Sequence, residues 1–311
     1  MNCILCNSPA LHRVDTLETP QLSRLYRNRA GVAVDRFFNR NAIDYLECEE
    51  CTLRFYWPQA IGDGLFYDEL QNYRNYYLQD KQEYRDAAVF VHPTDDILEI
   101  GPGEGKFTSY INYHSYLGLE FSEKAILTAR NNGINMKNED IRIHAAQHEQ
   151  QYDVVCFFQV LEHVANPRDF LDAAVHCLKP GGRLILAVPS EDSFIRVVVN
   201  SYLNMPPHHA SRWPDKTLGY VAKLFDLKLL KIVHENLHLV HRSFYDKTML
   251  HHSLRKWLGL KEKMLDGSIL NMAAYCMATI GSKFMRNGHH HLVTGQSVLA
   301  AYQRNDSNSK V

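Results

Sequence analysis

The sequence predicts an α/β fold built on a doubly wound, mostly parallel β-sheet. Short apolar segments at 96–100, 116–119, 153–158 and 183–188 have the length and composition of buried strands. Segments with helical periodicity separate them, and a glycine-rich turn, residues 101–105, follows the first strand. Strands that alternate with helices along a chain are typical of a parallel sheet covered by helices on both faces.

The helical segments have recognisable ends. A helix is expected from Lys106, directly after the glycine-rich turn. Another begins at Ser122, whose hydroxyl suits an N-cap, and ends at Gly133. A third, over 167–178, is stopped by a Lys-Pro-Gly-Gly turn.

Four regions are expected along the chain. Residues 1–58 hold two cysteine pairs, and residues 59–94 form a tyrosine-rich helical linker or lid. The α/β domain covers 95–241 and 296–304, with a helical insertion over 242–295 between its parts. The later elements expected are a helix over 215–225, a strand over 227–233, a buried helix over 268–281 and a last strand over 297–302.

Composition narrows the class of protein. The net charge of −1 over 311 residues argues against a nucleic-acid partner, because proteins that wrap nucleic acid usually carry a basic excess. No secretory signal and no run of about 18 apolar residues is visible, so a cytoplasmic protein without a transmembrane segment is expected. Peripheral contact with a membrane and the oligomeric state stay open.

The turn after the first strand has the pattern Gly-x-Gly-x-Gly, formed by Gly101, Gly103 and Gly105. Such a turn lets backbone approach a ligand closely. The dinucleotide-binding fingerprint is Gly-x-Gly-x-x-Gly, and here Lys106 stands where its third glycine belongs, which disfavours a nicotinamide enzyme. Glu120 ends the second strand and could accept both hydroxyls of an adenosine ribose.

These motifs resemble those of class I S-adenosylmethionine-dependent methyltransferases. The resemblance is carried by Leu-Glu-Ile-Gly-Pro-Gly-Glu-Gly at 98–105, Phe-Gln-Val-Leu-Glu-His-Val at 158–164 and Leu-Lys-Pro-Gly-Gly-Arg-Leu-Ile at 178–185. It covers residues 95–190 and implies a Rossmann-like fold with the cofactor across the carboxyl ends of strands one to four.

The resemblance also implies roles for single residues. The three glycines would line the methionine and ribose portions of S-adenosylmethionine, and Glu120 would take the ribose. Glu99 would brace the turn, and Gln159 would lie near the transferred methyl group. The acid that reads the adenine is expected at Glu139, with Asn138 and Asp140 as competing candidates.

Two Cys-x-x-Cys pairs in the first 51 residues, Cys3 with Cys6 and Cys48 with Cys51, predict a structural zinc site. Each pair presents two thiolates on one tight turn, which suits tetrahedral zinc. Chance pairing or a redox dithiol is the alternative. An N-terminal zinc module before a methyltransferase domain resembles enzymes of bacterial sugar and surface-polysaccharide pathways.

A hydroxyl nucleophile must lose a proton as it attacks, and histidine is the commonest base. The Pro-Pro-His-His segment makes His209 or His208 the preferred base or substrate contact, and His163 is a second candidate. Trp213 is expected as an apolar wall against a sugar ring. The tyrosines that could form a lid, or simply fill core space, are Tyr73, Tyr76, Tyr77 and Tyr84.

The sequence therefore predicts methyl transfer from S-adenosylmethionine to a hydroxyl of a small-molecule or carbohydrate acceptor. Two other hypotheses remain: an RNA methyltransferase that grips RNA with its zinc module, and a non-catalytic scaffold that only binds the cofactor. Neutral charge disfavours the first, and the complete glycine turn with Glu120 disfavours loss of cofactor binding.

Overall fold

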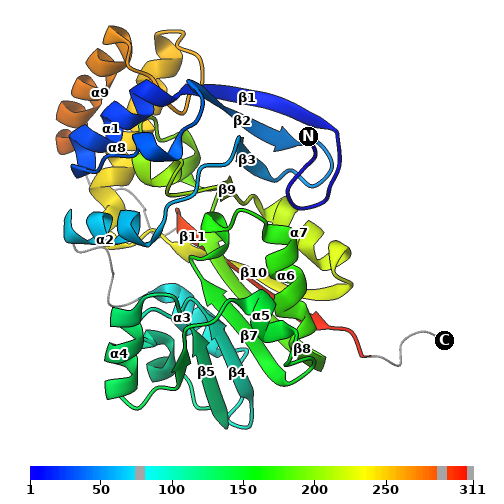
Figure 1. Ribbon diagram of the computed structural model, residues 1–311. Helices are drawn as coiled ribbons and strands as arrows, with labels where there is room; N and C mark the ends of the chain where they lie inside the picture. Colours follow the sequence, from blue (N-terminus) through cyan, green and yellow to red (C-terminus); the bar gives the residue numbers. More distant parts are fainter. Residues whose placement is uncertain (74–80, 286–292, 307–311) are drawn as a thin grey trace.

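A computed structural model describes residues 1–73, 81–285 and 293–306 (Figure 1). Two sheets organise this part of the chain: a seven-stranded sheet in the order β10-β11-β8-β7-β4-β5-β6 and a four-stranded sheet in the order β1-β2-β3-β9. The strands of the larger sheet are β4 (Asp96–Ile100), β5 (Ser115–Leu119), β6 (Met136–Lys137), β7 (Tyr152–Phe158), β8 (Leu178–Pro189), β10 (Leu227–Asn236) and β11 (Thr294–Arg304).

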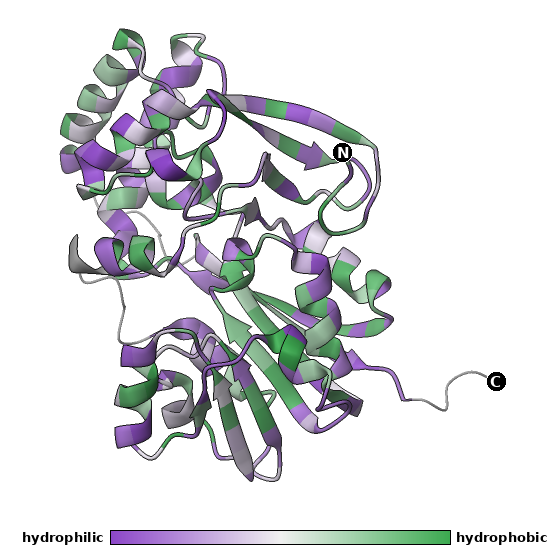
Figure 2. Cartoon of the chain, viewed as in Figure 1, coloured by the Kyte–Doolittle hydropathy of each residue, from purple (hydrophilic) through white to green (hydrophobic). Residues whose placement is uncertain are grey.

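The larger sheet confirms the predicted α/β fold. Strands β4, β5, β6, β7 and β8 are parallel to one another, and β11 runs antiparallel between β8 and β10. Its central strands are apolar on both faces because both faces are covered, and Figure 2 shows hydrophobic residues concentrated in them. The carboxyl ends of the parallel strands therefore share one edge, where the predicted site residues follow β4, β5 and β7.

Helices cover the two faces unequally. Leu98, Val155 and Leu186 point to the face where α5 (Ile141–Ala145), α6 (Pro167–His176) and α7 (Asp215–Leu224) lie. The opposite face meets α3 (Gln82–Ala88) and a 3-10 helix, η2 (Lys106–Tyr110). Helix α4 (Glu123–Asn131) covers the β6 edge.

The helix expected from Lys106 is only the short η2. Gly105 precedes it in a left-handed conformation with φ of 77°, and Ile111 after it is already extended. Five residues between these two points leave no room for a regular α-helix. The helix expected from Ser122 forms as α4, with the Ser122 hydroxyl accepting a hydrogen bond from the Ala125 amide.

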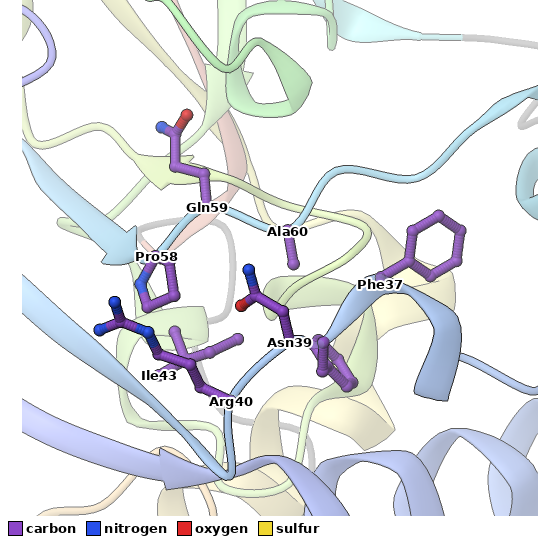
Figure 3. A pocket seen from close by; sticks show the side chains of 8 residues that line it. Phe37, Asn39, Arg40, Ile43, Pro58, Gln59 and Ala60 are labelled. Carbon is purple, nitrogen blue, oxygen red and sulfur yellow. The ribbon is translucent and has the colours of Figure 1, made fainter.

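The N-terminal residues form a sheet that the sequence did not predict. Its strands are β1 (Leu11–Glu18), β2 (Ala42–Cys48), β3 (Arg54–Trp57) and β9 (Ser211–Arg212). Helices α1 (Thr19–Ala30) and α2 (Gly64–Tyr73) accompany it. Because β9 comes from the loop after β8, this sheet joins the N-terminal residues to the α/β domain. Beside it, a hollow between Phe37 and Pro58 measures about 10 Å³, room for one water molecule and too small for a substrate (Figure 3).

The helical insertion holds α8 (Arg242–Trp257) and α9 (Ile269–Gly281). The helix expected over 268–281 forms, but the expectation that it is buried is wrong for its large side chains. Ala274 and Ala278 face the protein, whereas Ile269 and Ile280 are 81% and 62% exposed. Among the described residues, no helix is long and apolar enough to cross a membrane.

Candidate active site

The glycine turn after β4 has three glycines at alternate positions, all in left-handed conformation. Gly101, Gly103 and Gly105 have φ of 68°, 57° and 77°. A Cβ atom at Gly101 would lie 2.6 Å from the Val160 side chain, and one at Gly105 would lie 2.8 Å from Ile134. At Gly103 a Cβ would meet nothing within 4 Å. The turn therefore packs tightly at its two ends and leaves open space over its middle, as a backbone cradle for a ligand requires.

Glu120 follows β5 and holds this turn in place. One carboxylate oxygen accepts a 2.9 Å hydrogen bond from the Gly103 amide, and the other accepts from the amides of Phe121 and Ser122 at 2.8 and 2.9 Å. A carboxylate has about four acceptor positions, so one remains for a ligand hydroxyl. The adjacent Phe121 ring is 67% exposed and offers an apolar surface at the same edge, which the sequence analysis overlooked.

Glu99 lies one residue before the strand end and is 1% exposed. The Tyr116 hydroxyl donates a 2.7 Å hydrogen bond to its carboxylate. Burial raises the pKa of Glu99 to about 7. This side chain thus lies beneath the glycine turn, against the sheet.

Gln159 directly follows β7 and has a left-handed conformation, with φ of 57°. Its side-chain amide donates to the Glu83 carboxylate at 2.7 Å and to the Ser297 hydroxyl at 3.2 Å. A non-glycine residue in this region is uncommon and costs energy, so the surroundings must hold it there. These contacts fix Gln159 at the edge shared with the glycine turn.

The three candidates for the adenine contact have different surroundings. Glu139 is paired with His144 at 2.7 Å, and this hydrogen bond lowers its pKa. Asp140 caps α5 and contacts the Arg142 guanidinium. The Asn138 amide is 3.4 Å from the Phe121 carbonyl, which places it nearest to the exposed aromatic ring beside Glu120.

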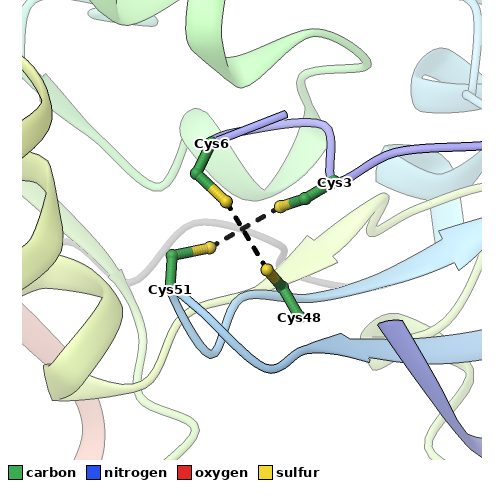
Figure 4. Close-up of side chains that lie close together, drawn as sticks. All are labelled: Cys3, Cys6, Cys48 and Cys51. Atoms are coloured by element: carbon green, nitrogen blue, oxygen red, sulfur yellow. Dashed lines mark hydrogen bonds between the residues drawn. The ribbon is translucent and has the colours of Figure 1, made fainter. Parts of the chain in front are cut away.

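The four N-terminal cysteines converge, although 41 residues separate the pairs (Figure 4). Their sulfur atoms lie within 4.8 Å of one another, with Cys3 and Cys51 3.6 Å apart and Cys6 and Cys48 3.5 Å apart. All four are free thiols. Zinc–sulfur bonds of about 2.3 Å in a tetrahedron place the sulfurs about 3.8 Å apart, so the donor set fits zinc without rearrangement.

The three histidines named as catalytic candidates also come together. His163 in the short helix η3 (Leu161–His163) and the loop residues His208 and His209 each offer a ring nitrogen within 4.8 Å of the others. Burial lowers the pKa of His163 to about 4 and those of His208 and His209 well below the usual value, so all three imidazoles are neutral. We call these three residues the histidine cluster.

Backbone hydrogen bonds fix the loop that carries two of the three histidines. The Ala210 amide donates to the Glu162 carbonyl at 2.7 Å, and the Met205 carbonyl accepts from the amides of His208 and His209. This attaches the loop to the turn that follows β7. The histidine cluster therefore lies at the same edge of the sheet as Gln159.

Comparison with known proteins decides the family. Residues 69–257 match the family described as a methyltransferase domain, which is more than half of the chain. The chain belongs to this family. It carries a methyltransferase domain. A methyltransferase structure from Archaeoglobus fulgidus shares the fold, with a TM-score of 0.50 and 15% identity over 78% of this chain and all of that one.

Curated relatives of the methyltransferase are similar over shorter stretches. The ubiquinone biosynthesis O-methyltransferase of Cronobacter sakazakii is 29% identical over 40% of this chain and 58% of its own length. That of Salmonella arizonae is 35% identical over 27% of this chain and 37% of its own length. The chain thus spans little more than half of the first relative and just over a third of the second.

One expected substrate contact is wrong. Trp213 is fully buried, and its indole nitrogen donates to the Ser211 hydroxyl at 3.0 Å, so it cannot form a wall for a sugar ring. Tyr84 is likewise a core residue, whose ring meets Phe107 at a tilt and Phe158 edge to face. Of the other lid candidates, Tyr76 and Tyr77 lie outside the described residues, and Tyr73 lies at the end of α2.

A groove of about 670 Å³ lies between the first cysteine turn, residues 3–7, and the start of α6. Its lining combines the Trp57 ring, 39% exposed, with the amide and charged groups of Asn166, Arg168 and Asp169. Ala165, also in the lining, is two residues after His163. The sequence analysis missed this groove because its two walls are more than 100 residues apart in the chain.

Proposed function

We propose that the methyltransferase methylates a hydroxyl group of a carbohydrate, either a sugar, a sugar nucleotide or a surface polysaccharide. The observation that supports a carbohydrate most directly is the groove whose lining includes Ala165, two residues after His163. An exposed indole with amide, carboxylate and guanidinium groups around it suits a sugar ring, which stacks one face and hydrogen-bonds around its rim. The names of the relatives, O-methyltransferases, support oxygen as the acceptor atom.

For the cofactor we propose the residues of the glycine turn and its neighbours. Gly103 offers the open backbone surface, Glu120 accepts one ribose hydroxyl, and Gln159 faces the reacting groups. Glu99 braces the turn from below, and Glu139 or Asn138 contacts the adenine. When bound, S-adenosylmethionine supplies the methyl group on a sulfonium. The protein contributes positioning and exclusion of water, which account for much of the rate in such displacements.

We propose His209 as the first candidate to accept the proton of the acceptor hydroxyl, with His208 and His163 as alternatives. Its imidazole is neutral, so one ring nitrogen carries a lone pair that can accept a proton, and the residue is 6% exposed. The change His209→Gln keeps a polar side chain of similar size and removes the basic nitrogen. Turnover should fall far more than cofactor affinity.

We further propose that Cys3, Cys6, Cys48 and Cys51 hold a structural zinc ion. Its role is to tie the first cysteine turn, which lines the groove, to the second. One zinc bound to four thiolates per chain is expected in metal analysis of the purified protein.

The acceptor is tested by mass spectrometry of sugars, sugar nucleotides and polysaccharide extracts after incubation with methyl-labelled cofactor. With the acceptor found, Trp57→Ala should raise its KM about three- to tenfold, because one stacked ring contributes roughly 0.5–1.5 kcal/mol. Trp257→Ala is the matched control, because Trp257 is 80% exposed on α8 and does not line the groove. Equal effects of the two changes, or label in no carbohydrate, would reject the proposal.

A further inference from the structure

Two members of the histidine cluster, His163 and His208, have the hydrogen-bond pattern found in metal ligands. His163 Nδ1 lies 2.6 Å from the His208 carbonyl oxygen, and His208 Nδ1 lies 2.8 Å from the Leu203 carbonyl oxygen. A carbonyl oxygen only accepts, so both Nδ1 atoms carry the proton and both Nε2 atoms carry the lone pair. Histidines that bind metals almost always donate their other ring N–H to a carbonyl or carboxylate in this way.

A buried carboxylate lies against the cluster. Glu162 is 1% exposed, and its Oε1 is 3.7 Å from His163 Nε2. Among the described residues, no donor lies within hydrogen-bonding distance of its Oε2. Burying a carboxylate oxygen without a hydrogen-bond donor costs free energy unless a cation or a proton binds to it.

We propose that His163, His208 and His209 bind a divalent transition-metal ion of the zinc class, with Glu162 as a further ligand. Three imidazoles and a carboxylate are a common donor set for such an ion. Metal–nitrogen bonds of about 2.1 Å in a tetrahedron place ligand nitrogens about 3.4 Å apart. The ring nitrogens of the three histidines are at most 4.8 Å apart, so each has to move toward the ion by no more than about 0.8 Å. Rotation of the side chains supplies this movement.

This metal deepens the proposed function, on which its role in the reaction rests. An acceptor hydroxyl that bound such an ion as a fifth ligand would be more acidic and would release its proton to water, so the ion rather than a free imidazole would activate the acceptor. His209 cannot be both a ligand and a proton acceptor through the same nitrogen. Metal binding itself stands on the geometry alone.

The test counts metals and identifies their ligands. Purified protein should carry two zinc ions per chain, one at the four cysteines and one at the histidine cluster. Cobalt substitution separates the two sites, since thiolate ligands give intense sulfur-to-cobalt charge-transfer absorption, whereas imidazole and carboxylate ligands give only weak d–d bands. We expect both kinds of band in the native chain.

Variants assign each band. His208→Gln and His209→Gln should reduce the count from two to one and remove only the bands without sulfur character, and Glu162→Gln should weaken the second ion at least about tenfold. His252→Gln on α8, outside the cluster, should keep both ions. Circular dichroism verifies that the variants are folded, and a variant that unfolds is replaced by His163→Gln.

Two results would overturn the proposal: a single metal per chain whose cobalt spectrum is entirely sulfur-derived, or a second metal that survives all of the histidine changes. Neither result depends on the acceptor. Failure to methylate carbohydrates with two metals bound would instead reject the proposed function and leave the metal site standing.

Discussion

Glu99 and Glu120 lie at the ends of neighbouring strands, yet their surroundings differ in kind. The Glu120 carboxylate is half-buried and accepts three backbone hydrogen bonds. Glu99 is sealed between the strand and Tyr116, and burial raises its pKa to about 7. At the residue scale, environment rather than residue type separates an acid that faces a ligand from one that supports the fold.

Glu99→Gln should flatten the pH dependence of stability. The pKa of Glu99 is about 7 in the folded protein and 4.5 as the ordinary value, so the folded state binds its proton more tightly. The stability that this gives is complete below pH 4.5 and is lost as the pH rises to about 7. Glutamine keeps an acceptor for Tyr116 without a charge, so at pH 8 the free energy of unfolding should exceed that of the native chain by up to about 3 kcal/mol.

Urea unfolding between pH 4 and 8 measures this difference. Glu123→Gln, at an exposed position in the first turn of α4, is the control and should follow the native profile. Parallel profiles for the native chain and Glu99→Gln would show that this carboxyl is already ionised in the folded state.

At the scale of single elements, α9 is the least expected. Its inner face is formed by small or polar residues, Asn271, Ala274 and Ala278, and its large apolar residues point outward. Small residues let it approach α8 closely: a Cβ on Gly281 would lie 2.7 Å from the Leu250 side chain. Close approach of the backbones therefore decides the orientation of this helix.

Replacing each of two adjacent residues of α9 with leucine tests this orientation. Ala278→Leu inserts three carbons into a fully buried position and should cost about 1–3 kcal/mol of stability. Met277→Leu, at a position 46% exposed, should change stability by less than about 0.5 kcal/mol. Thermal or urea unfolding compares them, and equal effects would mean that α9 packs through its other face.

Strong local signals made several elements predictable. The strands over 96–100 and 153–158 have uninterrupted apolar runs, and α4 has a serine cap. The orientation of α9 was not predictable because periodicity shows where the apolar face is but not what covers it. β1 and β2 were missed because they are amphipathic or mixed strands whose partners are set by contacts distant in the chain.

At the scale of the whole molecule, the cysteine turns are part of the main core. Cys3, Cys48 and Cys51 belong to the same buried cluster as Leu186 and Trp213 of the α/β domain. The clustering of His163 with His208 and His209 is also a property of the whole fold. The sequence identified these residues separately, but only the folding of the loop after β8 onto the turn after β7 brings them together.

Because the core is continuous, loss of the zinc proposed at the cysteines should destabilise the entire chain. Cys51→Ser should lower the free energy of unfolding by at least about 3 kcal/mol, as a single calorimetric transition at lower temperature. Cys276→Ser, at an exposed cysteine on α9, is the control and should leave the melting temperature unchanged. A small early transition followed by an unchanged main one would show that the N-terminal residues fold independently.

The central claim is that the glycine turn and Glu120 hold the adenosyl group of the cofactor. Titration calorimetry with S-adenosylmethionine tests it most directly, on the native chain, Glu120→Ala and the exposed control Glu123→Ala. We predict micromolar-scale affinity for the native chain and the control, and at least about tenfold weaker binding for Glu120→Ala, since charge-assisted hydrogen bonds contribute about 1.5–3 kcal/mol. Equal affinities in all three proteins would contradict the account.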